Sequence, residues 1–188
     1  GVHRAIVLIG PRRVGKTVML AQTIQALLDE GVPGTHILQL SLDTPLYSGR
    51  SLESMVRIFT ELHRHPADRQ LWVFFDEIQY VKDWEVHLKS LVDTFRHIRF
   101  VASGSAAAAL RMKSRESGAG RFSDFVLPPL TFAEYLDFAN LSGELIVEEQ
   151  RPDSPVPSYY APAIDRLNSA FVDYLNYGGF PEAVMNPV

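Results

Sequence analysis

The sequence has no cysteine among its 188 residues, and its formal net charge is only −4. The missing cysteines exclude disulfide bonds and thiolate metal ligands. No apolar run approaches the roughly 20 residues that a membrane-spanning helix needs. The six histidines show no ligand-like spacing, because His63 and His65 would point away from each other on a helix. The mild acidity does not favour a surface that coats nucleic acid.

The overall composition is that of an ordinary globular domain. Hydrophobic residues make up 46% and charged residues 21% of the chain, and 188 residues suffice for one domain with a full core. We expect a cytoplasmic protein with no membrane partner. Because the first residue is Gly1 instead of Met, we expect the natural N-terminus to lie upstream.

Residues 10–17 read Gly-Pro-Arg-Arg-Val-Gly-Lys-Thr, which matches a phosphate-binding P-loop at every specified position. Gly10 and Gly15 would let consecutive backbone N–H groups point at phosphate oxygens. Lys16 would contact the β- and γ-phosphates, and the Thr17 hydroxyl would ligate Mg²⁺. The pattern predicts ATP or ADP with Mg²⁺ as cofactors. The residues expected to contact the nucleotide are Gly10, Pro11, Arg12, Arg13, Val14, Gly15, Lys16, Thr17 and Val18.

The segments on either side of this loop support the interpretation. Residues 4–9 are apolar and predict a buried parallel strand. Residues 14–30 predict a helix, whose expected buried face consists of Val18, Ala21, Ile24, Leu27 and Leu28. A strand, a glycine-containing loop and a helix in this order aim the helix N-terminus at a phosphate.

The rest of the chain repeats the alternation of strand and helix. Further strands are predicted at 37–42, 71–75, 98–102 and 122–127, and helices at 51–65 and 83–95. This order predicts an α/β fold, a three-layer P-loop NTPase with a parallel sheet of about five strands.

The last third of the chain has a different composition. Residues 131–134 form a capping box that opens a short helix, and the proline-rich residues 142–162 predict a surface loop. One more helix is expected over 163–177. We therefore predict a P-loop ATPase core over 1–140, followed by a linker and a small helical lid over 141–188.

The third predicted strand leads into Asp76 and Glu77. A carboxylate at the end of a buried strand needs a cation or hydrogen-bond donors nearby. In a P-loop protein that cation is Mg²⁺, so Asp76 is expected to hold it together with Thr17. Glu77 is expected to polarise the water that attacks the γ-phosphate. The alternative is that the acidic pair only caps the next helix.

Two further residues complete the expected catalytic set of Lys16, Glu77, Ser103 and Arg121. Ser103 ends the fourth strand and would sense the γ-phosphate or orient the attacking water. Arg121 precedes the fifth strand and would stabilise the transition state, either in its own site or in that of a neighbouring subunit. The alternative for Arg121 is a solvated surface arginine.

Several segments together resemble one family. Beyond the P-loop they are Asp-Glu-Ile-Gln at 76–79, Gly-Arg-Phe at 120–122, Pro-Leu-Thr-Phe at 129–132 and Tyr-Gly-Gly-Phe-Pro-Glu at 177–182. The chain is similar to the AAA-like P-loop ATPases of bacteria and archaea, in which a nuclease-like C-terminal domain of unknown function follows the ATPase domain. The resemblance implies a functional Arg121 and places Gln79 beside the site.

The resemblance also implies a longer protein, because the family continues well past the Gly-Gly-Phe-Pro segment. We expect the chain to be an ATPase domain whose effector domain is absent, with a DNA or protein partner reached through that domain. A homo-oligomer is a further expectation. The favoured function is Mg²⁺-dependent ATP hydrolysis. The alternatives are a nucleotide-gated switch with little hydrolysis, linked to DNA, and a small-molecule kinase, which Glu77 disfavours.

Overall fold

The computed structural model describes residues 3–105, 120–150 and 155–185. The chain forms two compact units that divide between Leu127 and Pro128, with the loop residues Arg13–Gly15 grouped with the second unit. The sequence had suggested a boundary at 140. The division falls earlier because helix α5 (Phe132–Phe138) contributes to the hydrophobic core of the second unit.

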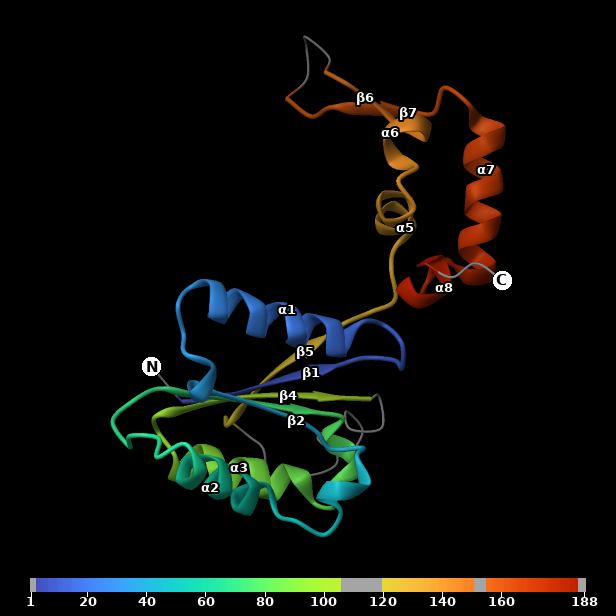
Figure 1. Ribbon diagram of the computed structural model, residues 1–188. Coiled ribbons are helices and arrows are strands. Elements are labelled where there is room, and N and C mark those ends of the chain that lie inside the picture. The colour runs from blue at the N-terminus through green and yellow to red at the C-terminus, as the bar shows by residue number, and fades with distance from the viewer. Residues whose placement is uncertain (1–2, 106–119, 151–154, 186–188) are drawn as a thin grey trace. The chain divides into compact units, whose positions relative to one another are not determined.

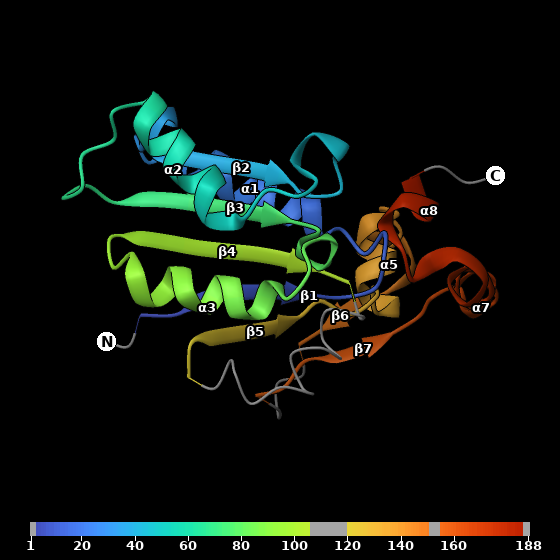
Figure 2. The same cartoon turned by 90° about the horizontal axis from the view of Figure 1, so that it is seen from below.

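The first unit is built on a sheet of five parallel strands. The strands are β1 (Ala5–Ile9), β2 (Ile37–Ser41), β3 (Leu71–Asp76), β4 (Ile98–Gly104) and β5 (Phe122–Val126). Their order is β2-β3-β4-β1-β5, and Figure 2 shows them side by side in this order. The predicted α/β fold with a five-stranded parallel sheet is confirmed. Because all strands are parallel, their carboxyl ends meet along one edge of the sheet.

Helices cover both faces of the sheet. Helix α1 (Lys16–Asp29) lies on one face, and helices α2 (Leu52–Leu62) and α3 (Trp84–Thr94) lie on the other (Figure 1). Side chains of β3 alternate between the two cores: Phe74 packs on the α1 side, whereas Val73 and Phe75 pack on the other. All three are fully buried, as expected for a central strand covered on both faces.

The buried face of α1 differs from the predicted one. Leu20 and Leu27 are buried against the sheet, whereas Val18 is 58% and Leu28 is 41% exposed. The prediction assumed a broad apolar stripe. In the structure α1 packs on the sheet along a narrow line formed by Leu20, Ile24 and Leu27, so apolar side chains beside that line stay outside the core.

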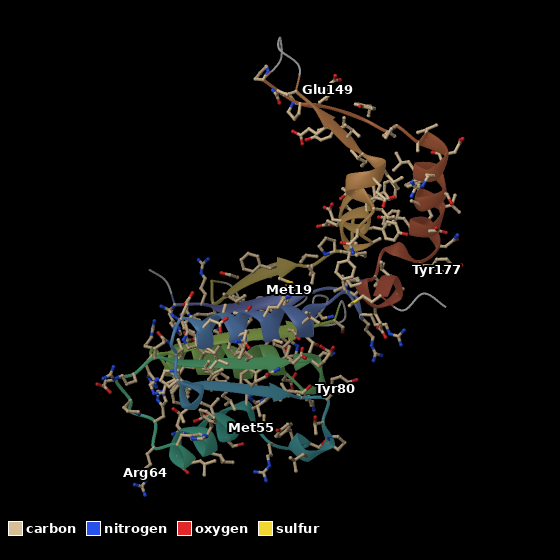
Figure 3. The ribbon with its side chains drawn as sticks, turned by 45° about the horizontal axis from the view of Figure 1, so that its top comes forward. Met19, Met55, Arg64, Tyr80, Glu149 and Tyr177 are labelled. Carbon is tan, nitrogen blue, oxygen red and sulfur yellow. The ribbon has the colours of Figure 1, made fainter. Side chains whose placement is uncertain are left out.

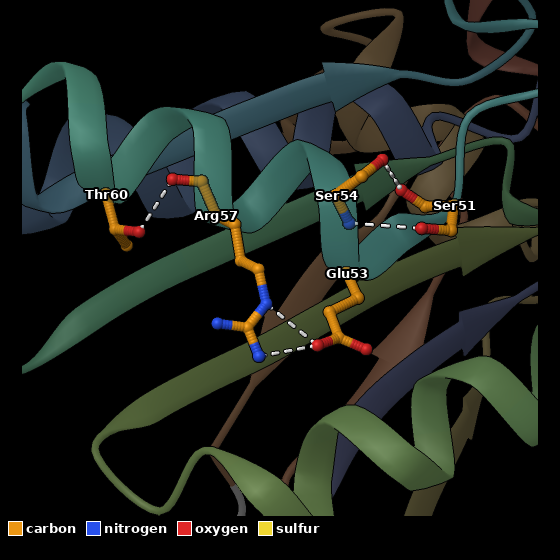
Figure 4. Close-up of polar contacts among 5 residues, drawn as sticks. All are labelled: Ser51, Glu53, Ser54, Arg57 and Thr60. Atoms are coloured by element: carbon orange, nitrogen blue, oxygen red, sulfur yellow. Dashed lines mark hydrogen bonds and ion pairs between the residues drawn. The ribbon is translucent and has the colours of Figure 1, made fainter.

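Local hydrogen bonds define the limits of α2 (Figure 4). The Ser54 N–H donates to the Ser51 side chain at 3.1 Å, which caps the helix. Within the helix, Arg57 pairs with Glu53 one turn earlier. The helix ends at Leu62, three residues before the predicted end, because Arg64 adopts a left-handed conformation with φ 46°.

Three short 3₁₀ helices join the main elements of the first unit. They are η1 (Gly34–His36), η2 (Pro45–Tyr47) and η3 (Ile78–Tyr80). The last of them follows β3 directly and therefore belongs to the carboxyl edge of the sheet.

The second unit consists mainly of helices. Besides α5, it contains α6 (Ser142–Leu145), α7 (Ile164–Asp173), the π-helical turn η5 (Tyr174–Gly178) and α8 (Pro181–Met185). The predicted capping box is confirmed, since Thr131 and Glu134 bond reciprocally at the start of α5. The core of the unit consists of Tyr135, Leu136, Leu145 and Ala170.

The segment expected as a surface loop contains regular structure. Besides α6 it holds two antiparallel strands, β6 (Val147–Glu149) and β7 (Ser158–Tyr160). The prolines misled the prediction, because the described ones, Pro155, Pro157 and Pro162, lie outside the two strands and do not remove ladder hydrogen bonds. None of the described helices is both long and apolar enough to cross a bilayer.

Candidate functional site

The P-loop follows β1, an inner strand of the sheet. The Gly10 N–H donates to the Gly104 carbonyl at 3.2 Å, which ties the start of the loop to the end of β4. Gly15 has φ 99°, and no atom lies within 4 Å of the position that a Cβ would take. The loop therefore needs glycine there for its backbone conformation and not for lack of space.

Lys16 begins α1, and its ammonium folds back over the loop. It donates to the carbonyls of Gly10 at 3.1 Å and Pro11 at 2.7 Å. Although it is charged, Lys16 is only 4% exposed. Burial lowers the pKa of this ammonium, the carboxylates of Glu77 and Asp76 oppose that shift, and Arg12 adds to it. A poorly solvated cation of this kind interacts strongly with an anion, because water screens it little.

Asp76 connects three elements of the sheet edge. Its Oδ2 accepts a hydrogen bond of 2.7 Å from the Thr17 hydroxyl on α1, and its Oδ1 accepts one from the Ser103 hydroxyl on β4. Asp76 is 2% and Ser103 is 0% exposed. A buried carboxylate needs such donors, and the two hydroxyls supply them.

Glu77 begins the turn that leaves β3. Its backbone N–H lies 3.1 Å from Asp76 Oδ1 and 3.1 Å from Ser103 Oγ. Its φ is 55° and its ψ is 48°, a left-handed conformation that costs a residue with a side chain roughly 1–2 kcal/mol. Backbone strain of this kind is concentrated at functional sites, where the surrounding contacts hold it in place.

Gln79 lies in η3, two residues after Glu77, and its side chain joins Glu77 to the residue that follows β4. Its amide nitrogen donates to Glu77 Oε2, and its amide oxygen accepts from the Ser105 N–H at 3.0 Å. Sequence reasoning placed Gln79 beside the site only through the family resemblance. The contact with Ser105 spans 26 residues of sequence, so no local pattern could have revealed it.

The structure brings Lys16, Thr17, Asp76, Glu77 and Ser103 together at the carboxyl edge of the sheet. The remaining residues of the predicted P-loop set lie in the loop itself, except Val18, which lies in the first turn of α1. Val14 is buried, Pro11 is half-buried, and Arg12, Arg13 and Val18 are exposed.

Arg121 lies at the amino edge of the sheet, the edge at which the parallel strands begin. Its carbonyl accepts from the Ala5 N–H at the start of β1, and its guanidinium pairs with Asp93 on α3. The P-loop follows the opposite end of β1, at least four residues of extended chain away. Arg121 therefore cannot reach the P-loop of its own chain. Of the three possibilities that the sequence leaves open, two remain: action in a neighbouring subunit, and a surface arginine paired with Asp93.

These observations define the class of protein. A P-loop after an inner strand, a buried lysine at the first turn of the next helix and an acidic residue ending a nearby parallel strand are the features of a P-loop NTPase. The chain belongs to the AAA domain family, whose model matches residues 2–136. It is thus a P-loop domain of the nucleotide-binding AAA type.

The similar proteins of known sequence are themselves uncharacterized. One from Haemophilus influenzae is 27% identical over 181 residues, which are 95% of this chain and 40% of that protein. Another, MJ1637 of Methanocaldococcus jannaschii, is 28% identical over 185 residues and is covered over 38% of its length. The chain therefore spans about two fifths of the length of these relatives.

Solved structures support the fold. The Aeropyrum pernix ORC1 protein in complex with DNA matches 96% of this chain with a TM-score of 0.53 and 12% identity, over 51% of its own length. The Saccharomyces cerevisiae Hsp104–casein complex matches 98% with a TM-score of 0.57 and 14% identity, over 33% of its length. At such low identity the likeness establishes the AAA fold alone.

Proposed function

We propose that this domain binds ATP with Mg²⁺ and hydrolyses it, and that turnover drives or gates an effector region of a longer protein. The observation that carries the proposal is the shared use of Asp76. One carboxylate is bonded to Thr17 of the P-loop helix and to Ser103 of β4, with Glu77 as the next residue. This arrangement supports the proposed roles of Lys16 as the cation, Asp76 as the metal ligand and Glu77 as the water-activating base.

The fit to Mg²⁺ follows from the donor set. Thr17 and Asp76 offer hydroxyl and carboxylate oxygens, the ligands that this ion prefers. No group of three or more acidic or histidine side chains among the described residues could hold a metal by itself. Two protein ligands suit Mg²⁺ bound together with phosphates, because the ion keeps several waters and uses substrate oxygens. When bound, the ion neutralises charge on the β- and γ-phosphates.

The residues of the chain then have distinct roles. The loop amides of residues 12–15 and the Lys16 ammonium hold the phosphates. The Glu77 carboxylate accepts a proton from a water molecule while the oxygen of that water forms a bond to the γ-phosphorus. The bond from that phosphorus to the bridging oxygen breaks, and ADP and phosphate are the products. Ser103, whose hydroxyl is bonded to both acidic residues, orients Asp76 and Glu77.

A catalytic role for Arg121 requires a site completed by a second subunit. Because Arg121 lies at the amino edge, it would contribute only to the γ-phosphate of a neighbouring copy. A homo-oligomer would therefore turn over ATP faster than a monomer. This predicts a turnover rate per molecule that rises with protein concentration and no longer rises in Arg121→Ala.

A second candidate function is a nucleotide-gated switch that hydrolyses slowly and responds to DNA or to a protein. It is favoured by the length of the relatives, since the chain spans only about two fifths of them and the coupled activity would lie in the remainder. The structural neighbours illustrate both kinds of partner, as ORC1 was solved with DNA and Hsp104 with casein. Rapid turnover without any partner would contradict the switch.

The decisive experiment compares Glu77→Gln with the wild type in the full-length protein. We expect the variant to keep its affinity for ATP and to lose turnover by about a hundredfold or more, because the amide cannot accept the proton. The control is Glu61→Gln, the same change on an exposed residue of α2. Turnover of Glu77→Gln at the wild-type rate would overturn the assignment of the base. Single-turnover measurements with and without DNA would separate hydrolysis from the switch.

A further inference from the structure

We propose that Gln79 is the positioning residue of Glu77, holding its carboxylate in the orientation needed to activate water. This inference rests on the proposed ATP hydrolysis and extends it to a residue outside the P-loop and the acidic pair. The geometry that carries it is the side-chain amide of Gln79, which joins Glu77 Oε2 to the backbone of Ser105.

The direction of both hydrogen bonds follows from chemistry. A backbone N–H can only donate, so the atom of Gln79 that faces Ser105 is the amide oxygen. The amide nitrogen must then face Glu77, whose ionised carboxylate can only accept. A flipped amide would place oxygen against oxygen at one end and donor against donor at the other. The network therefore determines the orientation of the amide.

Glu77 needs such a partner because the contacts that fix its backbone do not fix its side chain. The backbone N–H is bonded to Asp76 and Ser103, and the left-handed φ directs the chain out of β3. A free glutamate side chain would still sample several rotamers, and ordering it costs conformational entropy. The bond to Gln79 restricts that freedom in advance. It uses Oε2, and we assign the water to Oε1.

The anchor at Ser105 makes this support rigid. Gln79 follows β3 and Ser105 follows β4, which are paired strands. The pair Asp76–Ser103 bridges the same two strands one step earlier. Two polar bridges between the same strand ends hold the turn at Glu77 from both sides. A reactive group supported from rigid elements keeps its geometry better than one on a free loop.

The test uses two substitutions in the full-length protein, Gln79→Glu and Gln79→Leu. Gln79→Glu preserves shape and the acceptor for Ser105 but replaces the donor that faces Glu77 with a second carboxylate. Gln79→Leu removes both bonds. We expect kcat to fall about ten- to hundredfold in both, with the Kd for ATP within about twofold of wild type. The control is Gln70→Leu, because Gln70 also makes side-chain amide bonds but lies at the amino end of β3.

A double-mutant cycle distinguishes positioning from a general structural role. If Gln79 acts through Glu77, adding Gln79→Leu to Glu77→Gln will not lower the residual single-turnover rate further. The role of Gln79 would be overturned if its variants turned over ATP at or above the wild-type rate. It would also be overturned if the effects of the two substitutions multiplied in the double variant. Neither result would contradict the proposed ATP hydrolysis. If Glu77→Gln turns over ATP as fast as the wild type, the proposed role of Glu77 in hydrolysis is itself wrong. That result differs from the two that would contradict only the role of Gln79.

Discussion

The two edges of the parallel sheet both carry polar side chains, but they use them differently. At the carboxyl edge, Lys16, Asp76 and Ser103 are nearly inaccessible to water; Lys16 donates to carbonyls of the P-loop, and Ser103 donates to Asp76. At the amino edge, Arg121 and Asp93 form a partly exposed ion pair. Figure 3 shows Tyr80 and Arg64, which mark these opposite ends of the first unit.

The difference indicates which edge is functional. An exposed ion pair contributes about 0–1 kcal/mol and can be lost at little cost. Buried charges are expensive to desolvate, and a fold keeps them only where partners or ligands compensate. The buried charges of the carboxyl edge therefore lower the free energy of unfolding, and such a cost is usual for residues that are retained for activity.

The largest expected effect is the loss of nucleotide affinity in Lys16→Ala. Removing a buried cation from a phosphate site costs about 3 kcal/mol or more, which corresponds to at least a hundredfold in Kd. Titration with a fluorescent ATP analogue measures it. The matched control is Arg4→Ala, which removes an exposed cation just before β1, at the opposite end of that strand from the P-loop. Equal loss of affinity in the two variants would remove the distinction between the edges.

A smaller effect is expected for the stability of Ser103→Ala. Without the hydroxyl, the buried Asp76 carboxylate loses a donor, which costs about 1–3 kcal/mol of unfolding free energy. Ser41→Ala provides the comparison, since Ser41 also donates to an aspartate but is exposed. We expect less than about 0.5 kcal/mol there. Urea denaturation of both variants checks the difference, and a similar cost for the two serines would contradict it.

Much of the carboxyl edge was predictable from sequence because its residues follow apolar strands directly. The P-loop pattern placed Lys16 and Thr17 after β1, and the apolar run at 71–75 placed Asp76 at the end of β3. Parallel strands bring such positions to one edge without any knowledge of long-range contacts. The same rule applies to Arg121, which precedes a strand and so lies at the amino edge. The prediction of Arg121 as a catalytic residue did not take this position into account.

Other features depend on packing that no local pattern carries. The bridge from Gln79 to Ser105 and the narrow buried stripe of α1 both arise from how separate elements meet. The hairpin of β6 and β7 contains only three residues in each strand, which is too short for a periodic signal. The left-handed conformation of Glu77 was also unexpected, because glutamate rarely adopts it.

Both edges contain a residue with positive φ, which allows a direct comparison. Glu77 has φ 55° and Arg64 has φ 46°. At each position we expect the glycine variant to be more stable than the alanine variant by up to about 1 kcal/mol, the reverse of the usual order. Only Glu77→Gly should also lose ATP turnover. Thermal unfolding with a turnover assay tests both expectations, and an alanine variant as stable as glycine would show that the strain is absent.

The smallest expected effect is a pH dependence at the amino edge. His65 follows α2, and its pKa is lowered chiefly by burial and next by the neighbouring His36, with His97 adding to the shift. The unfolded chain, whose histidines titrate near about 6.5, then binds more protons than the folded one as the pH falls through and below that value. Stability is therefore complete above about pH 6.5 and declines on acidification. Urea denaturation at neutral and mildly acidic pH should show a smaller decline in His65→Gln than in the wild type, and a partial reduction in His36→Gln. If the stability of His65→Gln declines as steeply as that of the wild type, the acid sensitivity does not arise from His65.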